Sequence, residues 1–327
     1  MEDQSKTLKT KFCDVKWLPK SHEIYLDKST LIFGGSGTGK TKIIEEILFL
    51  LRDHIPNYIA ITDVNSRKFY TSKLPERCVQ NDLTKEKISA IWNRQAYLTE
   101  VCNIANDINN IRSLYEKIAT RHTEARLKIF SDLKLTAKDR IEKSADNYAV
   151  KREHIARIED MYVKETKDYY KLAIKENADR LKSIPLTDTD KITLEFLNVN
   201  PKLCIILDDV TDKFEKWIGY FKRTEVNPFD SIFFQGRHNN ITIVFAAHDD
   251  KVIPTELRKS ARNTVFTSSQ ALITAINRKG NAYSKNEQKL AEQIAPEIFG
   301  DDSKPGGEKR YQKLCYIKDE VPPFRYT

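Results

Sequence analysis

Short runs of consecutive apolar residues alternate with amphipathic stretches near both ends of the chain. The runs predict buried strands at 30–33, 58–62, 203–207 and 241–247. Shorter strands are predicted at 22–26, 265–267 and 314–317. Residues 40–55 place apolar side chains three and four positions apart, as in a helix with one buried face. The order strand, glycine loop, helix and strand predicts a βαβ unit within an α/β fold that has a mainly parallel sheet flanked by helices.

The middle of the chain has a different pattern. No glycine occurs between Gly39 and Gly219 and no proline between Pro75 and Pro185, while apolar residues from Ile88 onward recur mostly at steps of three and four. A stretch without helix breakers favours long amphipathic helices. We therefore expect a core in two parts, with a helical hairpin or bundle inserted between them. The expected segments are residues 1–83 (first part of the core), 84–183 (helical insertion) and 184–327 (second part of the core).

Composition adds a moderate positive charge and excludes some classes of protein. The 327 residues carry 55 Lys and Arg against 47 Asp and Glu, a net charge of +8, of which residues 84–183 account for +5. A charged helix face is most often solvated; the alternative is a contact with another subunit, DNA or a partner. Five cysteines without a close C-x-x-C pair argue against a disulfide framework or a zinc site. The polar start and the lack of a long apolar run predict a soluble intracellular protein with no membrane span.

The glycine loop matches the phosphate-binding pattern G-x-x-x-x-G-K-[ST], between a predicted strand and a predicted helix as that pattern requires. Glycines let backbone N–H groups turn toward phosphate oxygens, and the start of the helix adds positive potential. Lys40 is expected to reach the β- and γ-phosphates, and the Thr41 hydroxyl to bind Mg²⁺. The expected ligands are therefore ATP and Mg²⁺. The residues expected to bind the nucleotide are Gly34, Gly35, Ser36, Gly37, Thr38, Gly39, Lys40 and Thr41.

Two acidic residues directly follow the apolar run at 203–207. Asp208 and Asp209 are therefore expected at the carboxyl edge of the sheet, where ligands bind in open α/β folds. We assign Asp208 to the Walker B position, where it would hold Mg²⁺ directly or through water. Asp209 is expected to orient or deprotonate the attacking water, although glutamate, with one more methylene, has this role more often. The alternative is a solvated turn after a strand.

A histidine and three arginines complete the candidate catalytic set. His248 follows the run at 241–247, and its position resembles that of the polar sensor on the strand between the P-loop and Walker B strands of additional-strand P-loop proteins. The alternative is a structural histidine. Multimeric ATPases commonly use an arginine from a neighbouring subunit to stabilise the transition state. Arg237, Arg258 and Arg262 are candidates, and Arg237 is favoured because it lies in a short polar turn before the sensor strand.

Three stretches around these residues resemble the poxvirus-type genome-packaging ATPases of large DNA viruses, which belong to the FtsK–HerA superfamily. They are FQGRHNNI at 234–241, the polar strand end at His248 and Asp249, and IPTELR at 253–258. The resemblance covers residues 24–63 and 203–270. Two features depart from it: His248 stands where many relatives carry glutamine, and the helical insertion is long.

The resemblance implies a P-loop NTPase fold of the additional-strand class. It also implies a homo-oligomeric, ring-like motor that couples ATP hydrolysis to the movement of double-stranded viral DNA into a capsid. Such a motor needs phosphate contacts that do not depend on base sequence, and Lys- and Arg-rich helices can supply them. The implied partners are viral DNA and proteins of the capsid or packaging vertex. The implied location is the host cytoplasm or the virion.

Three alternatives stay open from the sequence. A small-molecule or nucleoside kinase uses the same P-loop, but it needs neither the additional strand nor the pair Asp208 and Asp209. A chromosome-structure protein of the SMC type also carries helices between its Walker motifs, but no LSGGQ-like signature occurs here and residues 84–183 are few for such an arm. A nucleotide-dependent scaffold would hydrolyse ATP weakly and without stimulation by DNA.

Overall fold

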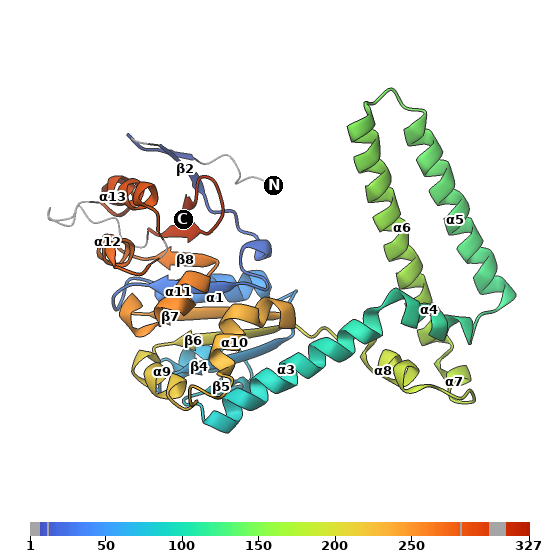
Figure 1. Cartoon of the computed structure of the whole chain (residues 1–327), viewed down its shortest axis with the longest axis horizontal. Coiled ribbons are helices and arrows are strands. Elements are labelled where there is room, and N and C mark those ends of the chain that lie inside the picture. Colours follow the sequence, from blue (N-terminus) through green and yellow to red (C-terminus); the bar gives the residue numbers. More distant parts are fainter. Residues whose placement is uncertain (1–6, 12, 282, 301–311) are drawn as a thin grey trace. The chain divides into compact units, whose positions relative to one another are not determined.

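The protein consists of two compact units (Figure 1). The computed structural model describes residues 7–11, 13–281, 283–300 and 312–327. We call residues 1–96 together with 200–327 the core unit, and residues 97–199 the insertion unit. Both boundaries of the insertion lie later in the chain than the expected 84 and 183.

A single sheet organises the core unit. Six neighbouring strands of it are parallel, and the strands beyond them at one end form a mixed extension. The sheet order among the described residues is β1-β2-β10-β9-β8-β3-β7-β6-β4-β5. The strands are β1 (Thr7–Lys9), β2 (Asp14–Trp17), β3 (Ser29–Phe33), β4 (Asn57–Thr62), β5 (Val79–Gln80), β6 (Leu203–Asp208), β7 (Ile241–Ala247), β8 (Asn263–Phe266), β9 (Leu314–Ile317) and β10 (Phe324–Tyr326).

The mainly parallel α/β sheet and the four buried strands predicted from the sequence are confirmed, as are the shorter strands at 265–267 and 314–317. The strand predicted at 22–26 is wrong. Residues His22–Ile24 form a short 3-10 helix, η1, whose N-cap Ser21 accepts a hydrogen bond from the Glu23 backbone N–H. The N–H of Leu26 donates to the carbonyl of His22 at 2.8 Å, so local bonds close the turn in place of strand pairing.

Helices cover both faces of this sheet. Successive residues of a strand point to opposite faces, so the central strands contribute to two apolar clusters: Ile205 and Leu207 of β6 pack in one, and Cys204 and Ile206 in the other. The helices of the core unit after the P-loop are α1 (Lys40–Leu51), α2 (Arg67–Thr71), α9 (Thr211–Ile218), α10 (Pro228–Gln235), α11 (Thr255–Ser260), α12 (Ser269–Asn277) and α13 (Lys285–Phe299). The short 3-10 helices are η2 (Glu76–Cys78), η3 (Gly236–Asn239) and η4 (Asp250–Val252).

Helix α1 packs on the face that carries Cys204 and Ile206. Ile44, Ile47 and Leu51 are fully buried there, and each such side chain contributes about 1.5–3 kcal/mol. Helices α9, α10, α12 and α13 contribute to the cluster on the other face. Because α1 begins at Lys40, its packing fixes the end of the glycine loop relative to the sheet.

Helix α3 (Lys85–Asn106) explains the first boundary of the insertion. Its first half carries Ile88, Ile91 and Trp92, which pack in the core cluster, and the Gln95 side chain donates to the backbone carbonyls of Pro201 and Asn239. The helix continues without a break, so the unit boundary falls inside it after residue 96. The expected boundary at 84 marked the start of the helix and not the edge of the core.

The insertion unit has a small apolar core of its own. It includes Ile111 and Leu114 of α4, Tyr170 of α6, and Leu197, which follows α8 and explains the later second boundary. The helices after α3 are α4 (Ile108–Glu116), α5 (Arg121–Glu142), α6 (Tyr148–Glu176), α7 (Ala178–Leu181) and α8 (Asp188–Phe196). Helices α5 and α6 pair over much of their length (Figure 1).

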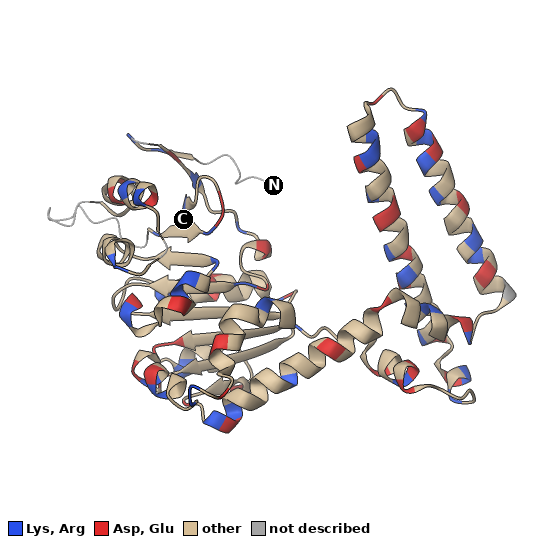
Figure 2. Ribbon diagram, viewed as in Figure 1, with Lys and Arg blue, Asp and Glu red and all other residues tan. Residues whose placement is uncertain are grey.

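The α5–α6 hairpin is mostly exposed. Among its described side chains, none between residues 122 and 168 is fully buried. Basic and acidic residues are interspersed along both helices (Figure 2), and several pair with each other, as in Lys143–Asp139 and Arg157–Glu153. This mixture favours the solvated interpretation of the local charge. No helix among the described residues is long and apolar enough to cross a membrane.

Candidate nucleotide site

The glycine loop connects β3 to α1 and depends on its glycines at two positions. A Cβ atom on Gly34 would lie 1.7 Å from the Thr267 hydroxyl oxygen, so any side chain there would collide with the segment after β8. Gly39, the N-cap of α1, has a φ of 94°, a conformation that side chains disfavour. Thr38 and Thr267 also approach each other through their hydroxyl oxygens at 2.5 Å. The loop is therefore braced against the neighbouring strand β8.

Lys40 begins α1 and points back into the loop. Its side chain is buried, and its Nζ donates to the carbonyls of Gly34 at 2.8 Å and Gly35 at 3.0 Å. The pKa of the Lys40 ammonium is lowered, because the effect of burial exceeds the opposing effect of the nearby carboxylates of Asp209 and Asp208. A phosphate in the loop would offer the same ammonium anionic oxygens in place of carbonyls. This geometry suits the role expected of Lys40.

Asp208 ends β6 and lies at the carboxyl edge of the sheet. It is 1 % exposed, and burial raises the pKa of its carboxyl to about 6. The Tyr70 hydroxyl donates to its Oδ2 at 2.8 Å. Thr62, its register partner at the end of β4, has a buried hydroxyl oxygen without a hydrogen-bond partner in the described structure. A buried carboxylate beside an unsatisfied hydroxyl fits the oxygen ligands that Mg²⁺ prefers.

Thr41, the other residue expected to bind Mg²⁺, is the second residue of α1 and is exposed. It follows the buried Lys40, so its position relative to the loop is the one that the phosphate-binding pattern requires. Asp208 and Thr41 are the residues that would hold the metal, with Thr62 as a neighbour that the sequence did not indicate.

Asp209 has an unusual backbone conformation. Its φ is 54°, in the left-handed region that residues other than glycine seldom adopt. Ser66 Oγ donates a hydrogen bond to Asp209 Oδ2 at 3.3 Å, and His248 Nε2 lies 3.2 Å from Asp209 Oδ1, which makes no hydrogen bond in the described structure. A strained residue held by its neighbours is common at functional sites. Asp209 therefore does not behave as a solvated turn residue.

His248 links Asp209 to Lys40. Its strand, β7, lies between β3 and β6, as the sensor prediction requires. His248 Nδ1 is 3.2 Å from Lys40 Nζ, and because an ammonium only donates, Nδ1 accepts. The other ring nitrogen, Nε2, lies 3.2 Å from Asp209 Oδ1. The chain Lys40, His248 and Asp209 thus joins three of the residues expected to be catalytic.

The three candidate arginines differ in their surroundings. Arg258 is largely buried and bonds to Asp250 through its backbone carbonyl and its carboxylate, so it stabilises the segment after β7. Arg262 pairs with Asp319 at 2.7 Å. Arg237 is exposed in η3, and its Nε donates to His238 at 3.2 Å.

Arg237 lies at the amino edge of the sheet, opposite the glycine loop. It precedes β7, whereas His248 follows it, and a strand of this length spans about 20 Å. The structure therefore does not bring Arg237 together with Lys40 and Asp209 within one chain. A role for Arg237 in catalysis requires a second subunit.

A large hollow occupies the amino edge around Arg237. Its volume is about 720 Å³, and cationic side chains from several segments line it. Burial, and then the charge of Arg262, lower the pKa of Lys28, so the cations there repel one another. The cationic lining residues are Lys28, Arg237, Arg262 and Lys318, and the acidic ones are Asp27 and Asp319. We call this feature the amino-edge hollow.

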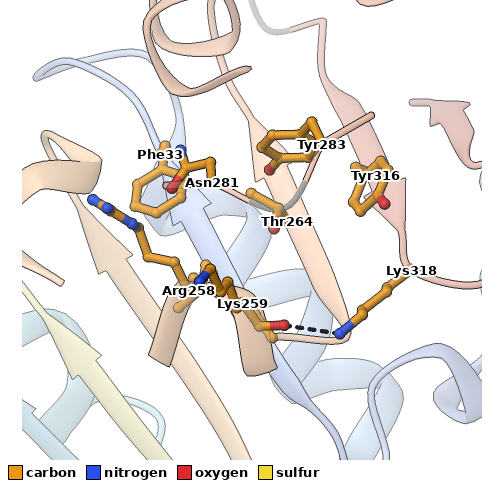
Figure 3. Close-up of a pocket in the computed structure, with 10 residues that line it drawn as sticks. Phe33, Arg258, Lys259, Thr264, Asn281, Tyr283, Tyr316 and Lys318 are labelled. Carbon is orange, nitrogen blue, oxygen red and sulfur yellow. Dashed lines mark hydrogen bonds between the residues drawn. The ribbon is translucent and has the colours of Figure 1, made fainter. Parts of the chain in front are cut away.

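Two other cavities of the core unit can be compared with the glycine loop. One, of about 250 Å³, adjoins the glycine loop and is lined by Gly35, His248 and Asp249 among others. The other, of about 30 Å³, lies between Arg258, Tyr283 and Lys318, whose Nζ donates to the Lys259 carbonyl at 2.9 Å (Figure 3). The smaller cavity has room for a water molecule and not for a nucleotide. The larger one provides space beside the phosphate loop.

Several residues of this site were not indicated by the sequence. Thr267, Thr62, Ser66 and Tyr70 contact or adjoin the expected residues, but each is far from its partner in the chain. The only signal was their position after predicted strands: Thr62 ends β4, Thr267 follows β8, and Ser66 and Tyr70 come soon after β4.

Comparison with known proteins gave distant similarities. No family model matches the chain. The chain is 26% identical over 321 residues to the uncharacterized protein B354L of African swine fever virus, in both the Kenya 1950 and the Namibia 1980 isolate. The match covers 92% of this chain and 81% of the relative. That protein therefore matches along nearly the whole chain, including the helical insertion.

The solved structures that match include the DNA-packaging ATPase B204 of Sulfolobus Turreted Icosahedral Virus, with a TM-score of 0.37 and 11% identity over 92% of this chain and 97% of that one. The plasmid coupling protein TrwB has a TM-score of 0.37 and 10% identity, over 92% and 85% of the two chains. The strand order of the chain itself carries the fold assignment. With β8-β3-β7-β6-β4 parallel and β7 between the P-loop strand and the strand of Asp208, this is an additional-strand P-loop NTPase fold.

Proposed function

We propose that the core unit binds ATP with Mg²⁺ and hydrolyses it. One observation carries this proposal: β3, β7 and β6 are adjacent and parallel, and their carboxyl ends bring Lys40, His248 and Asp208 with Asp209 to one edge of the sheet. If the match to the glycine pattern were fortuitous, an acidic pair and a histidine would not be expected beside the loop. The additional strand between β3 and β6 also disfavours the kinase alternative.

The roles follow from the contacts. Lys40 and the loop N–H groups bind the β- and γ-phosphates, while Asp208 and Thr41 hold Mg²⁺, which offsets the charge of the phosphates. Asp209 accepts a proton from the water whose oxygen attacks the γ-phosphorus, and the bond to the bridging oxygen breaks to give ADP and phosphate. His248 contacts Lys40 through Nδ1 and faces Asp209 with Nε2, so a γ-phosphate that binds Lys40 would change the contacts of His248 and report the state of the nucleotide.

We further propose that the protein works as a homo-oligomer in which Arg237 acts on the nucleotide of a neighbouring subunit. The position of Arg237 at the edge opposite its own glycine loop supports a role between subunits and excludes one within the chain. The amino-edge hollow supplies space and positive charge for a neighbour's phosphates and acidic residues. Such a head-to-tail contact closes into a ring when the rotation between subunits permits it.

The proposed work of this motor is the translocation of double-stranded viral DNA into a capsid. The genome-packaging sequence features at 234–241 and 253–258 support the packaging role, and the African swine fever virus relative supports a viral one. The net charge of +8 suits a polyanionic partner that is held without base readout. The host cytoplasm or the virion is the proposed location, and capsid or packaging-vertex proteins are the proposed partners.

The test is ATP turnover of the full chain with and without long double-stranded DNA, together with the oligomer mass in the presence of nucleotide. We expect Mg²⁺-dependent turnover, several-fold stimulation by DNA regardless of its sequence, and a mass of several subunits. Salt should reduce the stimulation, because counterions compete for DNA phosphates. Turnover that is weak, monomeric and unaffected by DNA would instead favour a nucleotide-dependent scaffold.

A further inference from the structure

Helix α2 lies directly beside the acidic pair of the nucleotide site. It follows β4 and is only five residues long, Arg67–Thr71, with Ser66 as its N-cap. Ser66 and Tyr70 are four positions apart and so lie on one face of the helix. Their hydroxyls donate to two consecutive carboxylates, Ser66 to Asp209 at 3.3 Å and Tyr70 to Asp208 at 2.8 Å.

The Tyr70 contact is fully enclosed. Tyr70 is 0 % exposed and packs in the same apolar cluster as Ile44 of α1 and Ile206 of β6. Its ring meets Phe69 edge to face with centroids 5.0 Å apart. The hydroxyl donates to only one oxygen of Asp208, Oδ2. A tyrosine wedged in this way fixes the rotation of the carboxylate about its χ2 bond and leaves Oδ1 for another ligand.

The α2 segment is itself tied to three neighbouring elements. Before the helix, the Asp63 carboxylate accepts the Ser66 backbone N–H at 2.8 Å. Within it, Arg67 Nη1 donates to the carbonyl of Val79 in β5 at 2.9 Å. After it, Lys73 pairs with Glu45 of α1 at 2.7 Å. These ties hold the two hydroxyls in place relative to β5, α1 and the residue that follows β4.

We propose that Tyr70 and Ser66 are positioning residues: Tyr70 orients Asp208 toward the metal and Ser66 orients Asp209 toward the attacking water. This inference rests on the proposed ATPase function. Hydrogen bonds to a metal-binding carboxylate typically change metal affinity by about 10–100-fold. The two residues therefore affect different quantities. Tyr70 determines how much Mg²⁺ the site requires, and Ser66 determines the rate of turnover.

The test uses the full chain with Tyr70→Phe, which keeps the ring and removes only the hydroxyl. A fluorescent, non-hydrolysable ATP analogue is titrated with and without Mg²⁺, and the Mg²⁺ concentration that gives half of the affinity gain is measured. We expect that concentration to rise about tenfold in Tyr70→Phe, while affinity for the analogue without Mg²⁺ stays within about twofold. Ser66→Ala should leave the Mg²⁺ requirement unchanged and lower turnover.

The matched control is Tyr58→Phe. Tyr58 lies on β4, four residues before the end of the strand that leads to α2, and its buried hydroxyl has no hydrogen-bond partner in the described structure. Its Mg²⁺ requirement should equal that of the unmodified chain. Thermal melting shows whether each variant folds, and the double variant Asp208→Asn with Tyr70→Phe should need no more Mg²⁺ than Asp208→Asn alone.

The outcomes separate this inference from the proposed function. If the unmodified chain gains no nucleotide affinity from Mg²⁺, the ATPase proposal fails first. If it gains affinity and folded Tyr70→Phe requires the same Mg²⁺ concentration, the positioning role of Tyr70 is overturned while the ATPase proposal stands. An equal rise in Tyr58→Phe would show that any hydroxyl lost near β4 has this effect, and it would also overturn the role.

Discussion

The two edges of the parallel sheet differ in how complete they are. The carboxyl edge contains a connected set, in which His248 contacts both Lys40 and Asp209, and Tyr70 donates a hydrogen bond to Asp208. The amino edge contains the amino-edge hollow, whose cations exceed its acidic residues. Among the described residues, Arg258 and Arg278 at the carboxyl edge are paired with Asp250, whereas Arg237 at the amino edge is exposed and contacts His238. This difference is what a head-to-tail assembly of identical chains would join.

Lys40→Ala should give the largest effect, because it removes the only ammonium inside the glycine loop among the described residues. We expect turnover to fall by at least about 10³-fold, with weaker binding of nucleotide as well. Lys42→Ala is the control, since Lys42 lies two residues further along α1, is exposed and pairs with Glu45. If Lys40→Ala hydrolysed ATP at the normal rate, the glycine loop would have no part in the proposed nucleotide site.

Asp209→Asn should slow the chemical step and spare binding. The amide keeps the size of the side chain but cannot take the proton from water, so turnover should fall by about 10²–10³-fold at unchanged nucleotide affinity. Single-turnover kinetics and nucleotide titration measure the two quantities. Asp212→Asn, at an exposed position in the first turn of α9, is the control. Loss of affinity without a separate loss of rate would make Asp209 structural.

Arg237→Ala tests the link between the edges. Alone, this variant should bind nucleotide normally and lose about 10²-fold in turnover, since a transition-state contact is gone. Mixed with Lys40→Ala, it should recover part of the activity, because an intact loop then meets an intact arginine of a neighbour. Arg223→Ala, another exposed arginine, should need no rescue. If mixtures of the two variants assemble but stay inactive, Arg237 has no catalytic role in a neighbouring subunit.

The smallest expected effect concerns stability without Mg²⁺ and nucleotide. Burial raises the pKa of Asp208 to about 6 from its ordinary 3.8, so the folded state holds this proton more tightly than the unfolded state does. The stabilisation is present below about pH 4 and is lost as the pH rises through about 6. Asp208→Asn replaces the carboxyl with an amide that does not ionise, so the protein keeps this stability at high pH. The free energy of unfolding should rise by about 1–3 kcal/mol at about pH 8. The gain should vanish near about pH 4.

Chemical denaturation at the two pH values, with Mg²⁺ chelated, measures that difference. Asp212→Asn again provides a control, because its side chain is exposed and should change neither value. An Asp208→Asn variant that is no more stable than the unmodified chain at the higher pH would show that the buried carboxylate is compensated in the folded protein.

Local features of this fold were predictable from the sequence, and contacts between distant segments were not. The glycine loop and the strands at 203–207 and 241–247 depend on nearby residues, so pattern and spacing sufficed. Tyr70 meets Asp208 across 138 residues, and nothing near Tyr70 in the sequence points to that partner. Nor does any local pattern separate Arg258 from Arg237, because burial beside Asp250 is a property of the folded chain. The insertion boundary was displaced because α3 runs through it without a break.

The position of β3 within the sheet has a consequence for synthesis of the chain. Its two neighbours, β7 and β8, pair with it from Ile243 and Asn263, more than 200 residues later. At about 5–20 residues per second, a ribosome needs on the order of 10–40 s to supply them, and throughout that interval the strand that carries the phosphate loop has unpaired edges. The insertion unit, which has an apolar core of its own, emerges first. A chaperone that shields the nascent core would therefore act on the segment that carries the proposed nucleotide site.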